Sequence, residues 1–435
     1  MIHAYRRIPS ALGFLLLFTL FSRADEALKQ PTMAEVEAVK QFIHASWPRT
    51  FHSANLGNFP LPAPYSSPGV TRFTGFYYWD TYFTSLGVIR DGHQEIARGN
   101  AEDMMYLIET MGYVPNGNDS ERNRSQPPVG ALQIQLCLEF VKDRAWHERA
   151  YAALEKEYGT WMAFRAFPDG LNHYGSYATP RQENELLQSC RSRLDPTIPE
   201  KPVARQKFAA HVMAVAESGW DFTPRWGDHC QEYASVDLNS LLLMTERVEA
   251  DLAGELANGR ERLWRERLEK RQSLMNRLLW DDQRGLYVDY DESTGQRSSF
   301  ISAASYFPLF CGVANSHQAE RSIQALAGLE TDYGVDTCLP GKRARVYQWD
   351  SPNLWPPLQW VVVSGLQQSG HPKEARRLAL KYVTTVVRNF QSSGQLWEKY
   401  NARTGKTDVA GEYKMVPMLG WTAGVFLACS KVAGY

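Results

Sequence analysis

The chain has 435 residues, of which 44% are hydrophobic and 22% are charged, enough to bury a large core without a structural metal or many disulfides. Its 47 basic and 48 acidic residues give a net charge of −1, which excludes the strongly basic surface of a nucleic-acid-binding protein. The 13 Trp, 21 Tyr and 19 Phe residues form a large aromatic set, and such rings suit a cleft that binds pyranose rings.

Residues 1–24 are typical of a secretory signal peptide. Arg6 and Arg7 precede an apolar run that ends at Phe21, and small residues lie at −3 and −1 of a cleavage site after Ala24. A membrane anchor is the alternative, but the run is shorter than the roughly 20 apolar residues of a membrane span. We therefore expect cleavage, no membrane span in the remaining chain, and a mildly acidic mature protein that is periplasmic or secreted.

The spacing of apolar residues predicts a chain of helices with few strands. The predicted helices cover residues 33–47, 100–111, 129–140, 146–164, 237–257, 260–279, 300–313, 317–329, 353–369, 372–392 and 420–432. This pattern favours one all-α domain over residues 25–435, built as a toroid of paired helices with long loops at one mouth. An α-solenoid is the alternative, but no sequence repeat of about 34–47 residues supports it.

The dipeptide Trp-Asp occurs four times, at Trp79-Asp80, Trp220-Asp221, Trp280-Asp281 and Trp349-Asp350. The intervals of 141, 60 and 69 residues are too irregular for the repeat of a β-propeller. Trp280-Asp281 precedes a glycine-containing turn and predicts the end of a helix followed by a short hairpin. We expect the other three dipeptides to lie in loops and to be functional candidates.

The six cysteines show neither Cys-x-x-Cys spacing nor a neighbouring histidine cluster. The sequence therefore predicts no metal site and no cofactor. It leaves open whether the cysteines form disulfides in an oxidising compartment or remain buried thiols.

Two carboxylates next to aromatic residues are candidates for acid–base chemistry. Asp221 lies between Trp220 and Phe222, where the rings are expected to desolvate it partly, as suits a general acid. Glu217 is the expected hydrogen-bond partner of Asp221. Near the C-terminus Glu398 follows an aromatic residue and precedes Lys399, which we expect to be an ordinary exposed residue. Two opposed carboxylates are sufficient to hydrolyse a glycosidic bond.

Several blocks of the sequence together resemble trehalases, glycoside hydrolase family 37. They occur in the order of the family from about residue 60 to the C-terminus, and they cover residues 72–80, 115–118, 124–128, 179–183, 217–221, 348–352, 398–400, 411–413 and 420–422. The resemblance implies an (α/α)6 toroid that hydrolyses the disaccharide α,α-trehalose to two glucose molecules with inversion of configuration. We expect a monomer without a cofactor, although the sequence leaves the oligomeric state open.

The resemblance assigns roles to individual residues. Asp221 corresponds to the general acid and Glu398 to the general base, with Glu412 as the alternative base. Trp349 and Trp355 are expected to form walls of the pocket. The substrate-binding positions implied by the family are Arg72, Trp79, Asp80, Asn116, Arg124, Ser125, Gln126, Arg181, Glu183, Gly219, Glu412 and Trp349.

The sequence departs from the family pattern in loops near these positions. Val70 and Thr71 stand where the family has a glycine before Arg-Phe, and Gln182 replaces a proline. Glycines close to a ligand permit close backbone approach, so these changes bear on the leaving-group side of the pocket. Two alternatives therefore stay open, namely hydrolysis of another α-glucoside and sugar binding without turnover.

Overall fold

A computed structural model describes residues 29–55, 59–119, 121–194, 198–343, 345–409 and 415–435. The predicted signal peptide and Glu412 lie outside these residues. The described chain is mainly helical. Its α-helices are α1 (Met33–Ser46), α2 (Tyr78–Arg90), α3 (Gln94–Met111), α4 (Gly130–Leu138), α5 (Arg144–Phe164), α6 (Pro180–Ser189), α7 (Pro202–Glu217), α8 (Val236–Leu256), α9 (Glu261–Leu278), α10 (Phe307–Phe310), α11 (Ser316–Ala325), α12 (Pro356–Gln368), α13 (Pro372–Ser393) and α14 (Gly420–Ala433).

Short elements connect these helices. The 3₁₀ helices are η1 (Trp47–Thr50), η2 (Arg191–Arg193), η3 (Cys230–Glu232), η4 (Ala303–Tyr306) and η5 (Leu326–Gly328). The strands are β1 (Phe51–His52), β2 (Tyr65–Ser66), β3 (Tyr233–Ala234), β4 (Trp280–Asp281), β5 (Leu286–Tyr287), β6 (Tyr290–Asp291), β7 (Gln296–Arg297), β8 (Asn353–Leu354) and β9 (Tyr400–Asn401). All strand pairs are antiparallel, in the orders β1-β2, β3-β6-β7, β4-β5 and β8-β9.

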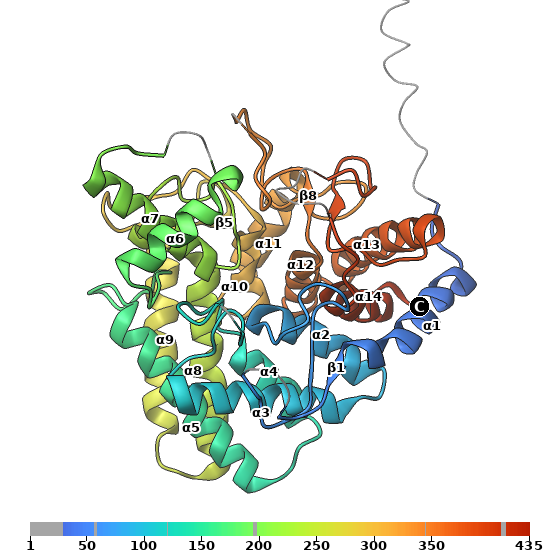
Figure 1. Cartoon of the computed structure of the whole chain (residues 1–435), viewed down its shortest axis with the longest axis horizontal. Coiled ribbons are helices and arrows are strands. Elements are labelled where there is room, and N and C mark those ends of the chain that lie inside the picture. The colour runs from blue at the N-terminus through green and yellow to red at the C-terminus, as the bar shows by residue number, and fades with distance from the viewer. Residues whose placement is uncertain (1–28, 56–58, 120, 195–197, 344, 410–414) are drawn as a thin grey trace, which may run out of the picture.

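The inner helices form a closed ring. In the described chain α2 packs against α4, α4 against α8, α8 against α10, α10 against α12, α12 against α14, and α14 against α2 again. An outer layer consists of α1, α3, α5, α9, α11 and α13, so inner and outer helices alternate along the chain. Only α6 and α7 interrupt this alternation, and Figure 1 shows them at one edge of the molecule. This is the predicted toroid of paired helices.

Local signals explain where several helices begin and end. Thr32 and Glu35 form a capping box at the start of α1, and Thr179 and Gln182 form another at the start of α6. The helix α3 ends at Gly112, whose φ of 88° lies in the left-handed region that glycine adopts easily. These short-range contacts are encoded in the sequence beside each helix.

Close backbone packing closes the ring between the first and last inner helices. A Cβ atom at Gly424 of α14 would lie 1.9 Å from the carbonyl oxygen of Phe83 in α2. A Cβ atom at Gly87 of α2 would lie 2.7 Å from the Cα atom of Gly424. The two glycines therefore allow α2 and α14 to approach each other backbone to backbone. Figure 1 shows the C-terminal end of the chain beside α1.

Most of the predicted helices are confirmed, with some corrections. The sequence analysis missed α2, α6 and α7, and it placed Trp79-Asp80 in a loop, whereas both residues lie in the first turn of α2. The predicted helix over 300–313 is shorter, because Ser302 forms a strand-like bridge with Cys338 and only η4 and α10 follow. The predicted helix over 353–369 begins at Pro356, since β8 occupies Asn353–Leu354. The hairpin after Trp280 is confirmed as β4-β5.

The buried apolar side chains of the described residues form one continuous cluster. Cys137, Cys230, Cys311 and Cys429 are buried free thiols within this core, and Cys338 is a buried thiol whose Sγ donates to the Asp350 carboxylate at 3.1 Å. Among the described residues, no helix combines the length and the apolar character that crossing a membrane requires.

Candidate active site

A cavity of about 360 Å³ lies at the end of the ring where several inner helices begin. Its volume falls within the roughly 300–1,000 Å³ of small-molecule sites. The loops that lead into α2, α4, α12 and α14 supply most of its lining. Among the predicted site residues, those that line it are Arg72, Trp79, Asp80, Asn116, Arg124, Gln126, Gly219, Asp221, Trp349 and Glu398. Asp221 and Glu398, far apart in the sequence, are thus brought to one cavity.

Gly219 and Trp349 position the loop that carries Asp221. Gly219 has a φ of 74°, in the left-handed region that favours glycine, and a Cβ atom there would lie 3.3 Å from Pro127, so a larger residue would also need a small shift of Pro127. The backbone N–H of Trp349 donates to the carbonyl of Phe222 at 2.9 Å, which joins this loop to the loop before α12.

Arg225 fixes the same loop to the buried core through ion pairs and ring contacts. Its guanidinium is buried and pairs with Asp237 at 2.8 Å and with Asp289 at 2.7 Å. It also makes cation–π contacts with two indole rings, 4.8 Å from the centroid of Trp220 and 4.4 Å from that of Trp226. Burial lowers the pKa of Arg225, but the charges of Asp237 and Asp289 outweigh this effect and raise it above its ordinary value, so the buried guanidinium stays charged.

Glu217 does not bond to Asp221 as the sequence analysis expected. It is completely buried and accepts hydrogen bonds from Arg165 at 3.1 Å and from the backbone N–H of Gly175 at 2.6 Å. It also accepts from the backbone N–H of Ser125 at 3.2 Å. Glu217 therefore ties the end of α7 to two other loops of the site.

Asp221 is partly exposed to solvent, with 38% of its side chain accessible. Its Oδ2 accepts a hydrogen bond from a guanidinium nitrogen of Arg193 at 3.0 Å, and the same nitrogen bonds the Asp221 carbonyl at 3.1 Å. Arg193 also lies 4.7 Å from the ring centroid of Phe222. A residue of η2 thus holds Asp221 at the cavity wall.

Glu398 is buried beside a buried cation. The Nζ atom of Lys399 lies 3.3 Å from its Oε2, and the Trp421 indole N–H donates to its backbone carbonyl at 3.0 Å. Lys399 itself is 1% exposed and lies 4.5 Å from the ring centroid of Trp355. The expectation of an ordinary exposed lysine was wrong, because the fold encloses the segment before β9.

Stacked indoles form one wall of the cavity. The rings of Trp349 and Trp355 lie 4.1 Å apart with an interplanar angle of 5°, and both residues line the cavity. Trp421 meets Trp355 edge to face at 5.7 Å. Flat aromatic faces of this kind stack on the CH groups of a pyranose ring.

Asp80 also lines the cavity, lies in the first turn of α2 and is buried. Burial, followed by the charges of Glu398 and Asp221, raises the pKa of Asp80 well above its ordinary value. A carboxyl group that keeps its proton can donate a hydrogen bond. The neighbouring Trp79 indole N–H is buried and has no hydrogen-bond partner among the described residues, so it too is a potential donor to a ligand.

A loop between α3 and α4 supplies amide and cationic groups. The side-chain oxygen of Gln126 accepts from the Trp79 backbone N–H at 2.8 Å, and Arg124 pairs with Glu121 at 3.1 Å. The backbone N–H of Asn116 donates to the Arg124 carbonyl at 2.9 Å, which closes the loop. Ser125 is fully buried, and its hydroxyl donates to the Val114 carbonyl at 2.7 Å. Ser125 is not among the described lining residues.

Arg181 and Glu183 lie on α6, and neither is among the described residues that line the cavity. The Arg181 side chain is 88% exposed and pairs with Glu185 at 2.8 Å. Glu183 is buried and accepts from Gln206 at 2.6 Å.

The sequence analysis missed other residues of the site. Arg193, Tyr77, Gln348 and Met418 line the cavity, and Lys399 lies behind Glu398. Gln348 is part of a block that was recognised, so the resemblance contained a signal for it. Arg193 stands in a short basic segment that carries no recognisable pattern.

Comparison with known proteins agrees with this arrangement. A family model described as trehalase matches residues 23–433. The periplasmic trehalase of Pseudomonas aeruginosa is 36% identical over 411 residues, covering 88% of this chain and 73% of the relative. The periplasmic trehalase of Xanthomonas oryzae pv. oryzae is 33% identical over 433 residues, covering 92% and 74%. These names support the predicted periplasmic location.

Solved structures match the fold. Neutral trehalase Nth1 from Saccharomyces cerevisiae is 25% identical with a TM-score of 0.74, covering 92% of this chain and 80% of the yeast chain. A mannosylglycerate hydrolase of family GH63 from Thermus thermophilus has a TM-score of 0.61 at 18% identity, covering 89% and 99%, and supports the fold alone. The predicted helical toroid is thereby confirmed. With a family match over nearly its whole length and relatives above 30% identity, the chain is a glycoside hydrolase that belongs to the trehalase family.

Proposed function

We propose that this protein hydrolyses α,α-trehalose to two glucose molecules with inversion at the attacked carbon. The observation that carries the proposal is that Asp221 and Glu398 line one small cavity with a wall of stacked indoles. The trehalase relatives support the choice of substrate.

In the proposed reaction Asp221 is the general acid and Glu398 the general base. Asp221 gives its proton to the glycosidic oxygen as the bond from that oxygen to the anomeric carbon breaks. Glu398 takes a proton from a water molecule whose oxygen forms the new bond on the opposite face. For this geometry the two carboxyl groups are expected to lie about 6.5–9.5 Å apart with substrate bound.

Arg193 occupies the carboxyl oxygen through which Asp221 would reach the glycosidic bond. Its guanidinium donates a hydrogen bond to the Asp221 Oδ2 at 3.0 Å. Hydrogen bonds of catalytic groups often reach their working geometry only in the substrate complex. We propose that Arg193 turns to a sugar hydroxyl when substrate enters, which leaves the Asp221 carboxyl group free to contact the glycosidic oxygen.

The other lining residues are proposed to bind the sugar. Neutral Asp80 and the Trp79 indole N–H would donate to hydroxyls, while Arg72, Asn116 and Arg124 would complete the polar contacts. The indoles of Trp349 and Trp355 would stack on a pyranose face. Substrate-binding roles for Ser125, Arg181, Glu183 and Glu412, and the alternative of Glu412 as base, stay predictions from the family resemblance.

We further propose that residues 25–435 form a single catalytic domain that acts as a monomer after the signal peptide is removed. The single continuous core of the described residues supports one domain. Size-exclusion chromatography with light scattering of the mature chain tests the monomer, and an elution mass of a dimer would contradict it.

The primary experiment follows the anomers of glucose by NMR while the purified mature chain acts on α,α-trehalose. Inversion yields equal initial amounts of α- and β-glucose, because one sugar leaves with its configuration kept and the other is inverted. α-Glucose alone would indicate retention and contradict the proposed roles. Turnover of other α-glucosides but not of trehalose would show that the substrate is a different α-glucoside. Sugar binding without any turnover would show that the protein binds sugars without catalysis.

Variants test the two carboxylates separately. Asp221→Asn and Glu398→Gln are each expected to lower kcat by about 10²–10⁴-fold while calorimetry still detects trehalose binding. Asp228→Asn in the same loop as Asp221 is the matched control, since this exposed residue is not among the described lining residues. Near-normal turnover by Glu398→Gln would transfer the role of base to another residue, with Glu412→Gln the next variant to measure.

A further inference from the structure

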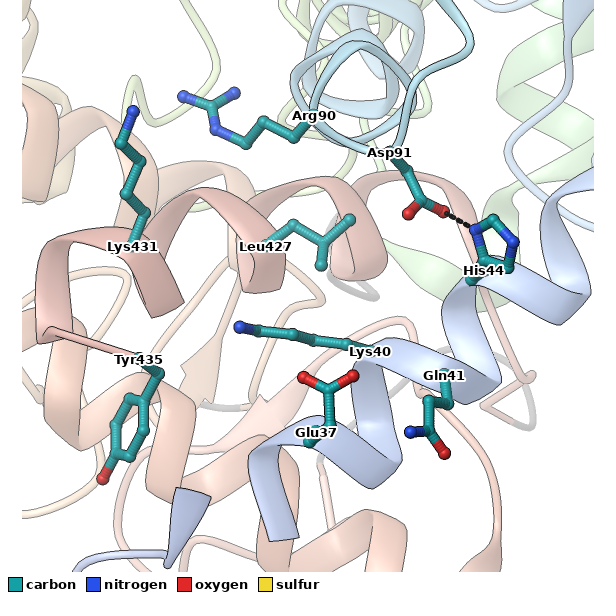
Figure 2. A pocket seen from close by; sticks show the side chains of 9 residues that line it. All are labelled: Glu37, Lys40, Gln41, His44, Arg90, Asp91, Leu427, Lys431 and Tyr435. Carbon is teal, nitrogen blue, oxygen red and sulfur yellow. Dashed lines mark hydrogen bonds and ion pairs between the residues drawn. The ribbon is translucent and has the colours of Figure 1, made fainter. Parts of the chain in front are cut away.

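A second group of chemically active side chains lies away from the cavity of Asp221 and Glu398. It consists of His44 in the last turn of α1, Asp91 at the end of α2 and His93 at the start of α3. One ligand atom from each lies within 4.8 Å of the others. His44 and Asp91 also line a separate cavity of about 780 Å³, in which Figure 2 shows their side chains pointing toward each other.

The distances within this group suit a metal ion. The His44 Nδ1 and the Asp91 Oδ2 lie 3.1 Å apart. Two ligands of a tetrahedral ion with bonds of about 2.0 Å are roughly 3.3 Å apart. A ligand atom of His93, the third residue, lies within 4.8 Å of both of these residues' ligand atoms. Its ring lies nearly parallel to that of His44, with the centroids 6.4 Å apart.

A second observation concerns the ring nitrogens of His93. The Nε2 atom of His93 is buried and has no hydrogen-bond partner among the described residues. Its Nδ1 lies 3.5 Å from the Glu95 carboxylate. A histidine that holds a metal through one ring nitrogen commonly faces a carboxylate with the other. The orphaned nitrogen and the carboxylate behind the ring together match this arrangement.

Among the described residues, neither Arg90 nor Lys40 forms an ion pair with the Asp91 carboxylate. Arg90 donates to the Leu86 carbonyl at 2.6 Å and lies 5.7 Å from the ring centroid of Trp360. Figure 2 shows the ends of Arg90 and Lys40 directed away from the pair of His44 and Asp91. Among the described contacts, the Asp91 carboxylate is bonded to the His44 ring and the Glu95 carboxylate faces the His93 ring.

We propose that His44, Asp91 and His93 bind one late first-row divalent cation, Zn²⁺ in particular. Two imidazoles and one carboxylate are ligands that Zn²⁺ takes readily, and water would fill the fourth position. The ion would join the end of α1 to the turn between α2 and α3. Its role is to stabilise the fold, because none of the three residues lines the cavity of the catalytic carboxylates.

Calorimetric titration of the EDTA-treated, dialysed mature chain with ZnCl₂ tests the proposal. We expect one saturable site per chain and a rise in Tm of about 2 °C or more at saturating Zn²⁺. Mg²⁺, which prefers oxygen ligands, is expected to produce neither effect. Absence of saturable Zn²⁺ binding would overturn the proposal.

Matched histidine variants locate the ion. His44→Ala changes a side chain that is 68% exposed, so the variant should fold, and we expect Zn²⁺ affinity to fall at least about tenfold. His317→Ala removes an exposed histidine on α11 and should leave binding unchanged. Unchanged binding in His44→Ala would refute the site. X-ray absorption should show only nitrogen and oxygen ligands, and a sulfur ligand near 2.3 Å would instead place the ion on a cysteine.

Discussion

At the scale of single residues, Glu398 and Lys399 form a buried ion pair in which neighbours in the sequence are also partners in space. Both side chains are almost completely buried, and their charged atoms lie 3.3 Å apart. Burial of two charges costs free energy that only good pairing offsets. The Trp355 ring stabilises the lysine from a second side. Lys399 is therefore a candidate positioning residue for the proposed base.

The variant Lys399→Met keeps the length of the side chain and removes its charge. Without the cation the buried Glu398 carboxylate loses the charged group beside it, so kcat should fall at least about tenfold while KM for trehalose changes less. Lys399→Arg, which keeps a cation at this position, should recover part of the lost kcat. Lys373→Met, an exposed position on α13, is the control. A kcat that Lys399→Arg does not recover, or a rise in KM as large as the fall in kcat, would indicate a merely structural role for Lys399.

At the scale of secondary-structure elements, the crossing of α2 and α14 depends on the absence of side chains. Gly424 and Gly87 face each other where the first and last inner helices meet. Backbone atoms cannot retreat as the end of a flexible side chain can, so added atoms here must push the helices apart. The closure of the ring, and with it the placement of Glu398 and Asp80 in one cavity, depends on this contact.

Gly424→Ala is expected to lower Tm by several degrees. The added Cβ atom would lie 1.9 Å from the Phe83 carbonyl oxygen, and such overpacking lowers the free energy of unfolding by about 1–3 kcal/mol or more. Gly159→Ala in α5 is the matched control, since nothing lies within 4 Å of the added atom. It should be neutral or stabilise by about 0.5–1 kcal/mol through helix propensity. Differential scanning calorimetry measures both, and equal Tm values for the two variants would contradict the packing argument.

At the scale of the whole molecule, several buried carboxyl groups make stability depend on pH. Burial raises the pKa of Asp103 and of Glu157 to about 7 and that of Glu249 to about 9. Both oxygens of Glu249 in α8 lack hydrogen-bond partners among the described residues. The charge of Glu155 raises its pKa further, and Arg260 and Arg267 act in the opposite direction.

These shifts predict that the folded protein loses stability as the pH rises. An unfolded glutamate ionises near pH 4.3, while folded Glu249 stays protonated up to about pH 9. Between these values unfolding releases a proton, so each pH unit costs the folded state up to about 1.4 kcal/mol. Glu249→Gln mimics the protonated group and should raise Tm at pH 8 but not at pH 4. A constant Tm difference across that range would contradict this account.

The sequence by itself determined the helical class, most helix positions, the family and the two candidate catalytic carboxylates. These features depend on local signals, such as apolar periodicity, caps at Thr32 and Thr179, and short blocks around Asp221 and Glu398. It failed for α2, whose aromatic and buried polar residues are almost all enclosed, so that no apolar stripe marks one face.

Only the tertiary structure decided which side chains share the site. Arg193 reaches Asp221 across 28 residues, and Lys399 packs on Trp355 from another loop. The tertiary structure also places Arg181 on the surface, away from the lining of the cavity, and places His44 close to Asp91 and His93. Such contacts join segments that are distant along the chain, and their distances are set by how the ring closes, which no local pattern of residues encodes.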